Sequence, residues 1–540
     1  MALSLTAEQK SVVKIFNSVS TYCIPSYQRS YSWDVDKCSV LWDDLEYALE
    51  SSKKDGYFIG NIVIAKSDDS DTLDLVDGQQ RLITLTLLLK ALSFFDNENE
   101  DIKESLWRQD RRDKEKKTQV VKSYVFENDD NAILLKYLGL EDLNQILNEA
   151  NQNRFATNFK FFYEKLEEFV KNKNIGEFSD FLLDKVYLLP IVARDEDEAK
   201  ANEKALMIFE TVNNRGLELS DADIFKAQLY NSALNDVKQD SFIKEWLNLT
   251  QYCKQIDVST AELFRMYMHI IRGRNKEIGN EIGLRTFFTK THPLKKKNYE
   301  EVLEDLYKIA FSLNLYNLSV KNEIKNKFIV KFSQVLSEYT IQYVKYAIVT
   351  YLFINSRVQD DQIVLDDEND YGTFLKQLTR FAYFYGSTTK TKFKFYEIIV
   401  ALVEQKKYQF NPPYKRDYDM LGSLKNGYIL LANYLDKNQE VIYPYYFDKI
   451  IFPSDIATLD ANWKNKEYYS YGETLGNLLL IDFTKKRRTL DKRAKFYYDS
   501  HVNETKKISQ EFEEWTYKKY KQRDKELVEK VKSFIEGNYE

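Results

Sequence analysis

The scarcity of turn-forming residues constrains the fold of this chain more than any other feature. Only 16 Gly and 7 Pro occur in 540 residues, alongside 39 Tyr and 34 Phe. Long helices that pack through aromatic side chains produce this balance, whereas a β-sandwich needs many more turn residues. We therefore expect a predominantly helical α+β protein, and the chain length predicts two or three domains.

Charge, cysteine content and hydropathy narrow the class of protein further. The net charge is -6, so the chain as a whole does not attract polyanions, and any surface that binds nucleic acid must be local. The three cysteines, Cys23, Cys38 and Cys253, form no CxxC pair, which is typical of a reducing compartment and argues against a cysteine-bound zinc. The N-terminus lacks the features of a signal peptide, and no apolar run approaches the ~20 residues of a membrane span. These features predict a cytoplasmic protein without a membrane partner.

Hydrophobic periodicity predicts several elements in the first half of the chain. Strands are expected at Tyr57–Ala65, Thr72–Val76 and Val186–Ala193. Helices are expected from Thr6 to Val19, where Thr6 and Gln9 have the spacing of a capping box, and from about Arg81 to Phe95.

The segment Asp77–Arg81, "DGQQR", is a polar turn between the second strand and the following helix. Asp77 can accept hydrogen bonds or hold Mg²⁺, and Gly78 allows close approach of the backbone. The first N–H groups of a helix favour an anion, Arg81 offers a planar fork for phosphate oxygens, and either Gln79 or Gln80 can orient a water. The polar turn therefore predicts an anion site suited to a nucleotide, although the chain has no Walker loop.

A structural explanation of the same residues stays open at this point. Asp77 can cap the helix and pair with Arg81 four residues later. A second polar motif, "IPSYQRSYSW", places Tyr27, Gln28 and Arg29 in an irregular aromatic segment, and Arg29 can pair with Asp77. A third motif, "FETVNNRGLELSDADIF", lies at a corner between two helices.

These motifs, in this order and together with "YFIGNIVI", resemble the N-terminal domain of GmrSD-type (Type IV restriction) proteins over roughly residues 8–235. SspE-like defence proteins share this domain, which is related to the ParB/sulfiredoxin fold. The resemblance implies a domain that binds or hydrolyses NTP with Mg²⁺. It implies catalytic roles for Asp77, Gln79, Gln80 and Arg81, with Asp77 as the metal ligand. It implies nucleotide contacts from Tyr27, Gln28, Arg29, Gly78 and Arg81.

The C-terminal region resembles an HNH-type nuclease that has lost its catalytic histidine. "KIIFPSD" and "TLGNLLLI" are similar to two boxes of that nuclease, and Asn477 matches the second box. Ile450 occupies the place of the histidine, and isoleucine can neither take a proton nor bind a metal. The other histidines of the chain, His269, His292 and His501, lie outside both boxes. We therefore expect a degenerate ββα (HNH-like) domain.

A basic stretch follows the second box. Its seven basic residues, which can neutralise phosphates of DNA, are Lys485, Lys486, Arg487, Arg488, Lys492, Arg493 and Lys495. The alternative is a solvated basic helix face that is offset by nearby acidic residues. The expected domains are residues 1–235 (nucleotide-binding, with a helical insertion), 236–410 (helical) and 411–540 (HNH-related).

The resemblance thus implies a bacterial anti-phage defence protein that binds and hydrolyses NTP through the polar turn and contacts DNA through its basic C-terminal surface, with its nuclease activity lost. Two alternatives remain: a non-enzymatic sensor of modified DNA or of a phage protein, and an active Mg-dependent endonuclease that uses residues outside the family pattern. A phage component or a partner defence protein is a candidate partner. The residues leave the nucleotide, the trigger and the oligomeric state open.

Overall fold

A computed structural model describes the chain with gaps. The described residues are 5–18, 20–51, 56–68, 70–109, 117–125, 129–149, 152–212, 221–234, 238–386, 391–414, 422–459, 463, 471–483, 492–493, 497–511 and 515–539. The chain forms two compact units: Met1–Thr250 with Phe288–Val302, and Gln251–Phe287 with Leu303–Glu540. We call them unit 1 and unit 2. The predicted boundary near residue 410 lies inside unit 2, and the division into three domains stays a prediction.

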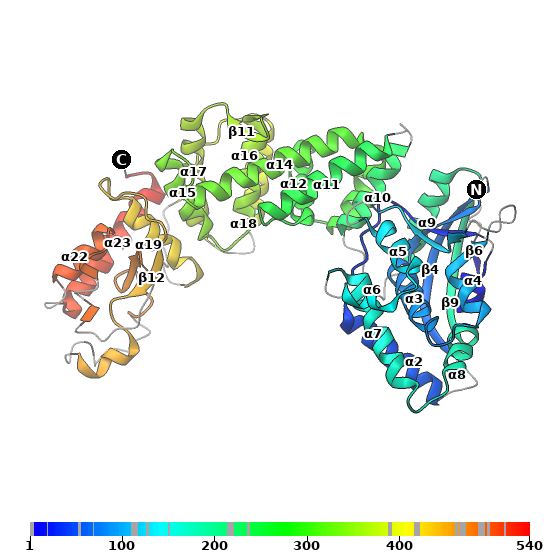
Figure 1. Ribbon diagram of the computed structural model, residues 1–540. Helices are drawn as coiled ribbons and strands as arrows, with labels where there is room; N and C mark the ends of the chain where they lie inside the picture. The colour runs from blue at the N-terminus through cyan, green and yellow to red at the C-terminus, as the bar shows by residue number, and fades with distance from the viewer. Residues whose placement is uncertain are drawn as a thin grey trace. The chain divides into compact units, whose positions relative to one another are not determined.

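Unit 1 is built on one mixed sheet (Figure 1). Its strands are β1 (Leu5–Ala7), β2 (Lys10–Ser11), β3 (Thr21–Ile24), β4 (Tyr57–Ser67), β5 (Thr72–Asp77), β8 (Val121–Ser123) and β9 (Val186–Asp195). The strand order is β1-β9-β4-β5-β3-β8, with β2 also paired to β9. β4 is parallel to β9 and antiparallel to β5. The run Ile62–Ala65 of β4 is buried as a continuous apolar segment, so both faces of the sheet are covered at this strand.

Helices cover this sheet. In unit 1 they include α1 (Val12–Phe16), α2 (Val35–Ser51), α3 (Gln79–Leu92), α4 (Glu100–Leu106), α5 (Asp130–Gly139), α6 (Leu143–Asn148), α7 (Arg154–Phe169), α8 (Ile175–Asp180), α9 (Glu198–Val212) and α10 (Asp221–Leu234). α9 packs on β4, β5 and β9, while α3 packs against α7. A small hairpin of β6 (Trp107–Gln109) and β7 (Lys117–Gln119) completes the described strands of unit 1.

Unit 2 is mainly helical. The helices of the central part of the chain are α11 (Gln239–Gln255), α12 (Thr260–Arg274), α13 (Leu284–Thr286), α14 (Tyr299–Val320), α15 (Lys327–Ser337), α16 (Tyr343–Ile354), α17 (Glu368–Tyr385) and α18 (Thr391–Val403). Of these, α11 and α14 begin in unit 1 and end in unit 2. The last part has α19 (Lys425–Tyr434), α22 (Asn503–Glu511) and α23 (Tyr517–Glu536). Two short hairpins pair β10 (Ser356–Gln359) with β11 (Gln362–Leu365), and β12 (Tyr446–Lys449) with β13 (Leu478–Ile481). No helix in the described ranges is both long and apolar enough to cross a membrane.

The predominantly helical α+β class is confirmed, as are the three predicted strands and the helix that follows the polar turn. The predicted helix from Thr6 to Val19 is wrong in its first half. Leu5–Ala7 and Lys10–Ser11 instead pair antiparallel with β9, and only Val12–Phe16 is helical. An exposed sheet edge offers unpaired backbone groups, and pairing with it outweighs the local helical pattern.

Candidate functional site

The polar turn connects β5 to α3. β5 ends at Asp77, and Gly78 occupies the N-cap position of α3 with φ 92° and ψ 6°. A Cβ atom at Gly78 would lie 2.4 Å from Cγ2 of Ile62 on β4, so only glycine fits both the backbone conformation and the space. The alternative in which Asp77 caps the helix is therefore wrong, because Gly78 holds that position.

The Arg81 guanidinium lies against β4. Its Nη1 atom donates to the carbonyl oxygen of Asn61 at 2.7 Å. A Cβ atom at Gly60 would be 3.5 Å from Cζ of Arg81, which places the guanidinium over this glycine. Asp77 and Arg81 are both described, and they form no ion pair with each other. The remaining guanidinium donors of Arg81 have no hydrogen-bond partner among the described residues, so they are available to an anion.

Three charged groups and a helix N-terminus meet at this turn. Burial raises the pKa of Asp77, while the positive charges of Arg81 and Arg29 and a hydrogen bond from the Gly78 backbone oppose the rise. Arg29 is exposed and forms no hydrogen bond or ion pair with any described residue. The first N–H groups of α3 have no acceptor within the helix. The arrangement provides two cationic side chains and a positive helix end beside one carboxyl group, which suits an anion that carries a metal ion.

The two glutamines of the turn differ in their surroundings. Gln80 is buried, and its Oε1 atom accepts from the N–H of Ser32 at 2.7 Å and from the N–H of Trp33 at 3.3 Å. Its Nε2 atom donates to the carbonyl oxygen of Ser30 at 3.3 Å. The Gln80 amide therefore holds residues 30–33 against α3. Gln79 is also buried, and its Oε1 atom, which is inaccessible to solvent, has no hydrogen-bond partner among the described residues. Its role in orienting a water stays a prediction.

The aromatic motif "IPSYQRSYSW" contributes buried side chains next to the polar turn. Gln28 is buried and donates from Nε2 to the carbonyl oxygen of Val76 at 2.8 Å, which fixes the motif to the end of β5. Tyr27 is 3% exposed, and its ring centroid lies 5.0 Å from that of Tyr230 on α10. Its hydroxyl has no hydrogen-bond partner in the described part of the chain. Tyr27 is thus an interior residue, and its contact with a nucleotide stays a prediction.

Asp74, in the middle of β5, was not predicted as a functional residue. Burial raises its pKa to about 6, the negative charge of Glu198 adds to the rise, and a hydrogen bond from Asn202 opposes it. Burial also raises the pKa of Tyr27, and Asp74 and Glu198 contribute further. The one signal in the sequence is a carboxylate inside the strand-like run "TLDLV".

Replacing Asp74 by Asn should stabilise the protein at neutral pH. The folded state holds the pKa of Asp74 at about 6, above its ordinary value of 3.8. The carboxyl group therefore binds a proton more tightly in the folded state, and its contribution to stability is full below pH 3.8 and is lost as the pH rises through 6. We expect Asp74→Asn to raise the free energy of unfolding by roughly 1–3 kcal/mol at pH 7.5, with the gain shrinking towards zero near pH 4. Urea unfolding of both proteins between about pH 4 and pH 7.5 measures the difference in the free energy of unfolding. A difference that does not change with pH would contradict the prediction.

The two segments predicted to be HNH-like boxes lie together around the β12–β13 hairpin of unit 2, and their relation to a nuclease stays a prediction. Ile450 follows β12 and is fully buried, as is Asn477, which precedes β13. The Asn477 side chain accepts from the N–H of Ile451 at 2.9 Å and donates to the carbonyl oxygens of Ile451 and Gly472 at 2.9 and 3.1 Å. Asn477 thus serves as a structural bridge between the boxes. The residues 484–491, where a ββα motif would continue, lie outside the described ranges.

Only two residues of the predicted basic surface are described. Lys492 is exposed. Arg493 is 6% exposed, and its guanidinium binds the carboxylate of Asp455 and donates to the carbonyl oxygen of Ile450 at 3.0 Å. The prediction that Arg493 lies on a DNA-binding surface is therefore wrong, because its guanidinium is buried and binds groups inside unit 2. The other members lie outside the described residues: Lys485, Lys486, Arg487, Arg488 and Lys495.

The histidines of unit 2 occupy different environments. His269 is 1% exposed, and burial lowers its pKa to about 3, so it is neutral at physiological pH. His501 has an exposed ring whose Nδ1 atom lies 2.8 Å from a carboxylate oxygen of Asp482. Burial raises the pKa of Asp482, but hydrogen bonds from the His501 backbone, the Ser500 hydroxyl and the His501 ring outweigh it and leave the pKa lowered. This pairing orients the His501 ring as a carboxylate orients a general base.

Comparison with known proteins identifies the first part of the chain. Residues 12–230 match the family described as the GmrSD restriction endonuclease, N-terminal domain. The match spans the polar turn and the aromatic motif, and it confirms the resemblance predicted from these motifs. No curated protein matches the chain as a relative.

Proposed function

We propose, from the premise that residues 12–230 form a GmrSD-type restriction domain, that this chain is an anti-phage defence protein that binds and hydrolyses NTP at the polar turn. The family match supports a restriction-type defence protein. The nucleotide and its hydrolysis are proposals that rest on the geometry of the turn.

One observation carries the proposal: Arg81 is positioned at the helix N-terminus, and the described residues engage only one of its donors. Its Nη1 atom is anchored to the Asn61 carbonyl, which fixes the plane of the guanidinium over β4. The Arg81 charge acts on the pKa of Asp77, but the two side chains form no direct ion pair that would occupy the Arg81 donors. Because the guanidinium is already fixed, little conformational entropy is lost when its remaining donors bind a phosphate.

Each residue of the turn then has a distinct role. Arg81 and the first N–H groups of α3 bind phosphate oxygens, and Arg29 adds a second cation from the exposed edge. Asp77 would hold the Mg²⁺ that accompanies the triphosphate, because its carboxylate forms no ion pair with the residues that the structure describes. Mg²⁺ at this position would neutralise charge on the phosphate oxygens. Gln80 and Gln28 fix the surrounding segments, and the sequence assigns the orientation of the attacking water to Gln79.

The C-terminal part is proposed to contact DNA or a partner without cutting. Ile450 is buried in the apolar cluster of this region, where it can neither activate a water nor bind a metal. Lys492 remains exposed, and it supports a phosphate contact together with the neighbouring basic residues of the sequence.

A hydrolysis screen tests the proposal. The full-length chain is incubated with each common NTP and Mg²⁺, with and without plasmid DNA, and phosphate release is measured. We expect turnover of at least one nucleotide that stops when Mg²⁺ is removed by EDTA. The absence of both turnover and binding for every NTP, with tight binding of modified DNA or a phage protein, would instead select the non-enzymatic sensor.

One observation favours the second alternative, an active nuclease. The Nδ1 atom of His501 lies 2.8 Å from a carboxylate oxygen of Asp482. The same reactions report on it when the plasmid is analysed on a gel. Mg²⁺-dependent nicking that disappears in His501→Ala would show a nuclease that uses residues outside the family pattern. An intact plasmid would support the proposal that the C-terminal domain has lost nuclease activity.

A further inference from the structure

The last helix of unit 2, α23, has a buried apolar face and a basic face that is turned to solvent. Tyr520, Leu527 and Val531 belong to the buried face and pack in the hydrophobic cores of unit 2. Four lysines with the spacing i, i+3, i+7 and i+14 share the other face. They are Lys518, Lys521 and Lys525, which are exposed, and Lys532, which is half-buried. We call these four residues the lysine stripe.

The charge of the lysine stripe is not balanced by acidic partners. None of its four members forms an ion pair within the part of the chain that the structure describes. Two acidic residues of α23 are engaged elsewhere: Asp524 accepts the N–H of Gly476 at 2.7 Å, and Glu526 accepts the side-chain amide of Gln522 at 2.9 Å. Glu529 lies beside the stripe, so the four lysines and Glu529 together carry a charge of +3.

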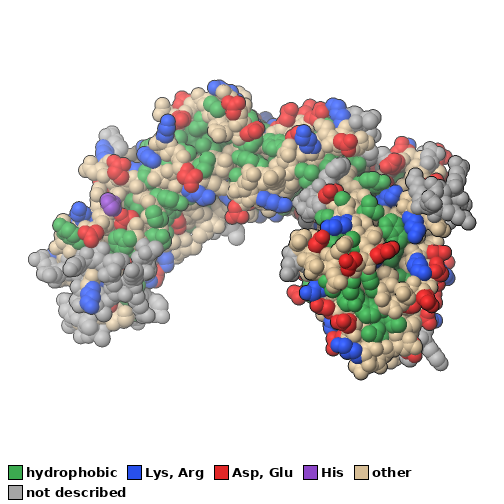
Figure 2. Space-filling view, viewed as in Figure 1, with side chains coloured by type: hydrophobic (Ala, Val, Ile, Leu, Met, Phe, Trp, Pro, Cys, Tyr) green, Lys and Arg blue, Asp and Glu red, His purple; other side chains and the backbone are tan. Residues whose placement is uncertain are grey.

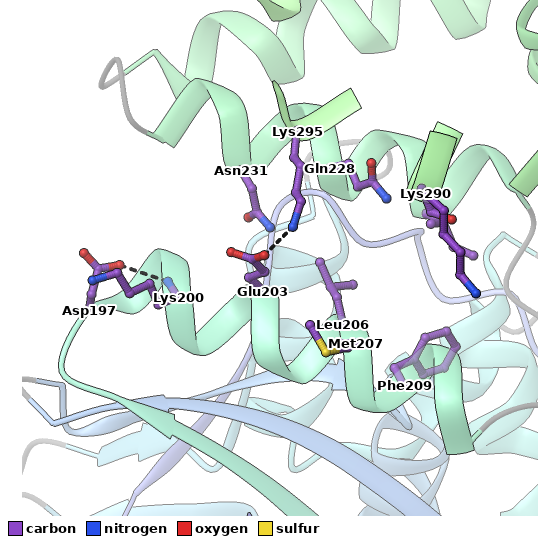
Figure 3. A pocket seen from close by; sticks show the side chains of 12 residues that line it. Asp197, Lys200, Glu203, Leu206, Met207, Phe209, Gln228, Asn231, Lys290 and Lys295 are labelled. Atoms are coloured by element: carbon purple, nitrogen blue, oxygen red, sulfur yellow. Dashed lines mark hydrogen bonds and ion pairs between the residues drawn. The ribbon is translucent and has the colours of Figure 1, made fainter. Parts of the chain in front are cut away.

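Several other lysines of the chain do have acidic partners. On the face of the molecule shown in Figure 2, Lys and Arg side chains lie among Asp and Glu side chains. At the cavity of unit 1 drawn in Figure 3, the dashed line joins Lys295 to Glu203. Lys238 pairs with Glu300 at 2.8 Å in the same unit. The lysine stripe differs from these paired lysines because its charge is left to attract a partner.

Helix stability does not explain the lysines near the start of α23. The N-terminus of a helix carries a partial positive charge, which favours acidic residues in the first turn and disfavours lysine. The first turn of α23 contains Lys518 and no acidic residue, and Lys521 follows in the next turn. The helix therefore keeps positive charge where it weakens the helix. The same partial charge adds to the attraction for an anion.

Arg523, on the buried side of α23, fixes the helix to the rest of unit 2. Its guanidinium donates to the carbonyl oxygens of Gly476 and Leu478 at 2.7 and 3.1 Å. It also pairs with the Glu504 carboxylate of α22 at 2.8 Å. Because the backbone of α23 is held in this way, only the lysine side chains lose conformational entropy when a partner binds.

The chemistry of the stripe selects a partner with a row of negative charges. From Lys518 to Lys532 the stripe extends about 21 Å along the helix axis, at 1.5 Å per residue. Each strand of a DNA duplex carries a phosphate about every 3.4 Å of its axis, so a line of this length passes several phosphates. Insertion of α23 into a membrane surface is excluded, because its apolar residues are buried in unit 2.

We propose that the lysine stripe is a docking surface for the phosphate backbone of duplex DNA. It rests on the proposed function, since it extends the DNA contact of the C-terminal part from Lys492 to α23. Lysines that bind phosphates displace condensed counterions, so the affinity falls steeply as the salt concentration rises. Their ammonium groups contact the backbone and not the base edges, so this surface binds DNA of any sequence.

Fluorescence anisotropy of a labelled DNA duplex with the full-length chain tests the stripe over a range of salt concentrations. We expect the natural protein to bind duplexes of unrelated sequence equally well. Lys521→Gln with Lys525→Gln should lower the slope of log affinity against log salt by about 2. The same double variant should weaken binding at least about tenfold at roughly 0.1 M salt. Glutamine has a helix propensity close to that of lysine, so α23 stays helical.

Two control variants separate the charge of the stripe from its other properties. Lys521→Arg with Lys525→Arg keeps both charges and should bind DNA with the slope of the natural protein. Lys238→Gln with Lys295→Gln also removes two positive charges, but both of these lysines are ion-paired residues of unit 1. This second control should change neither the slope nor the affinity.

The outcomes distinguish this surface from the rest of the proposed function. Unchanged slope and affinity in the glutamine double variant would overturn the stripe, while DNA binding by the natural protein would still support the contact through Lys492. No DNA binding by the natural protein would overturn both contacts, whereas phosphate release from NTP reports on the polar turn separately. Polyglutamate that competes as well as unlabelled duplex would indicate an acidic protein as the partner and would also overturn the proposal.

Discussion

Arg81→Ala is expected to lower NTP hydrolysis by about 100-fold, the usual cost of removing one preorganised donor to a developing charge. The guanidinium is held by the Asn61 carbonyl at 2.7 Å and over Gly60, so its loss removes a fixed group and not a mobile one. Phosphate release at saturating NTP and Mg²⁺ measures the effect.

Two controls separate catalysis from folding. Arg81→Lys keeps the positive charge but loses the planar fork, and we expect an intermediate rate. Arg357→Ala removes an exposed arginine of the β10–β11 hairpin in unit 2, and the rate should not change. Full activity in Arg81→Ala would rule out the polar turn as the hydrolytic site.

Asp455→Ala is expected to destabilise the β12–β13 region of unit 2 by roughly 3–5 kcal/mol, because it removes the counter-charge that Asp455 provides to the buried Arg493 guanidinium. The side chains of Asp455 and Arg493 are each 7% exposed, and one pair of their atoms lies 3.1 Å apart. The Asp455 carboxylate also accepts the N–H of Phe452 at 2.7 Å, so its removal leaves a second donor unpaired. Hydrogen exchange over residues 446–455 measures the loss of local stability.

The matched control breaks an exposed pair. Asp34 and Lys37, with side chains 52% and 43% exposed, form an ion pair at the start of α2. Lys37→Ala should cost less than about 1 kcal/mol. Replacing both partners of the buried pair, Asp455→Leu with Arg493→Met, should recover most of the stability, since no charge then remains buried. Equal losses of stability in Asp455→Ala and Lys37→Ala would contradict the claim that the buried ion pair contributes more than the exposed one.

The sequence predicted the frame of the candidate site because that frame is local. A buried strand, a glycine and a helix follow one another directly, and each has its own periodicity or backbone requirement. The positions of Asp77, Gly78 and Arg81 therefore followed from the pattern. The helix predicted from Thr6 failed for the opposite reason, since its first residues pair with β9, more than 170 residues away in the chain.

The roles of individual polar side chains could not be predicted in the same way. Gln79 and Gln80 are adjacent and chemically identical, yet only Gln80 reaches Ser32, 48 residues before it. Arg493 belongs to a run of basic residues that predicts an exposed face, yet it meets Asp455, 38 residues before it. Such pairings depend on the tertiary structure, and a single sequence contains no record of them.

The path of the chain through unit 1 has a consequence for separating its parts. The family match ends at residue 230, but the compact unit also includes Phe288–Val302, which returns after residues 251–287. The Phe288 ring lies 5.1 Å from that of Phe225 on α10, and Lys297 accepts a hydrogen bond from Ser232 at 2.9 Å. A protein truncated at the family boundary would expose this side of α10 to solvent. The restriction-type domain is thus not a detachable module at its recognised limit, and recombination that exchanges it between defence proteins would have to carry this later segment as well.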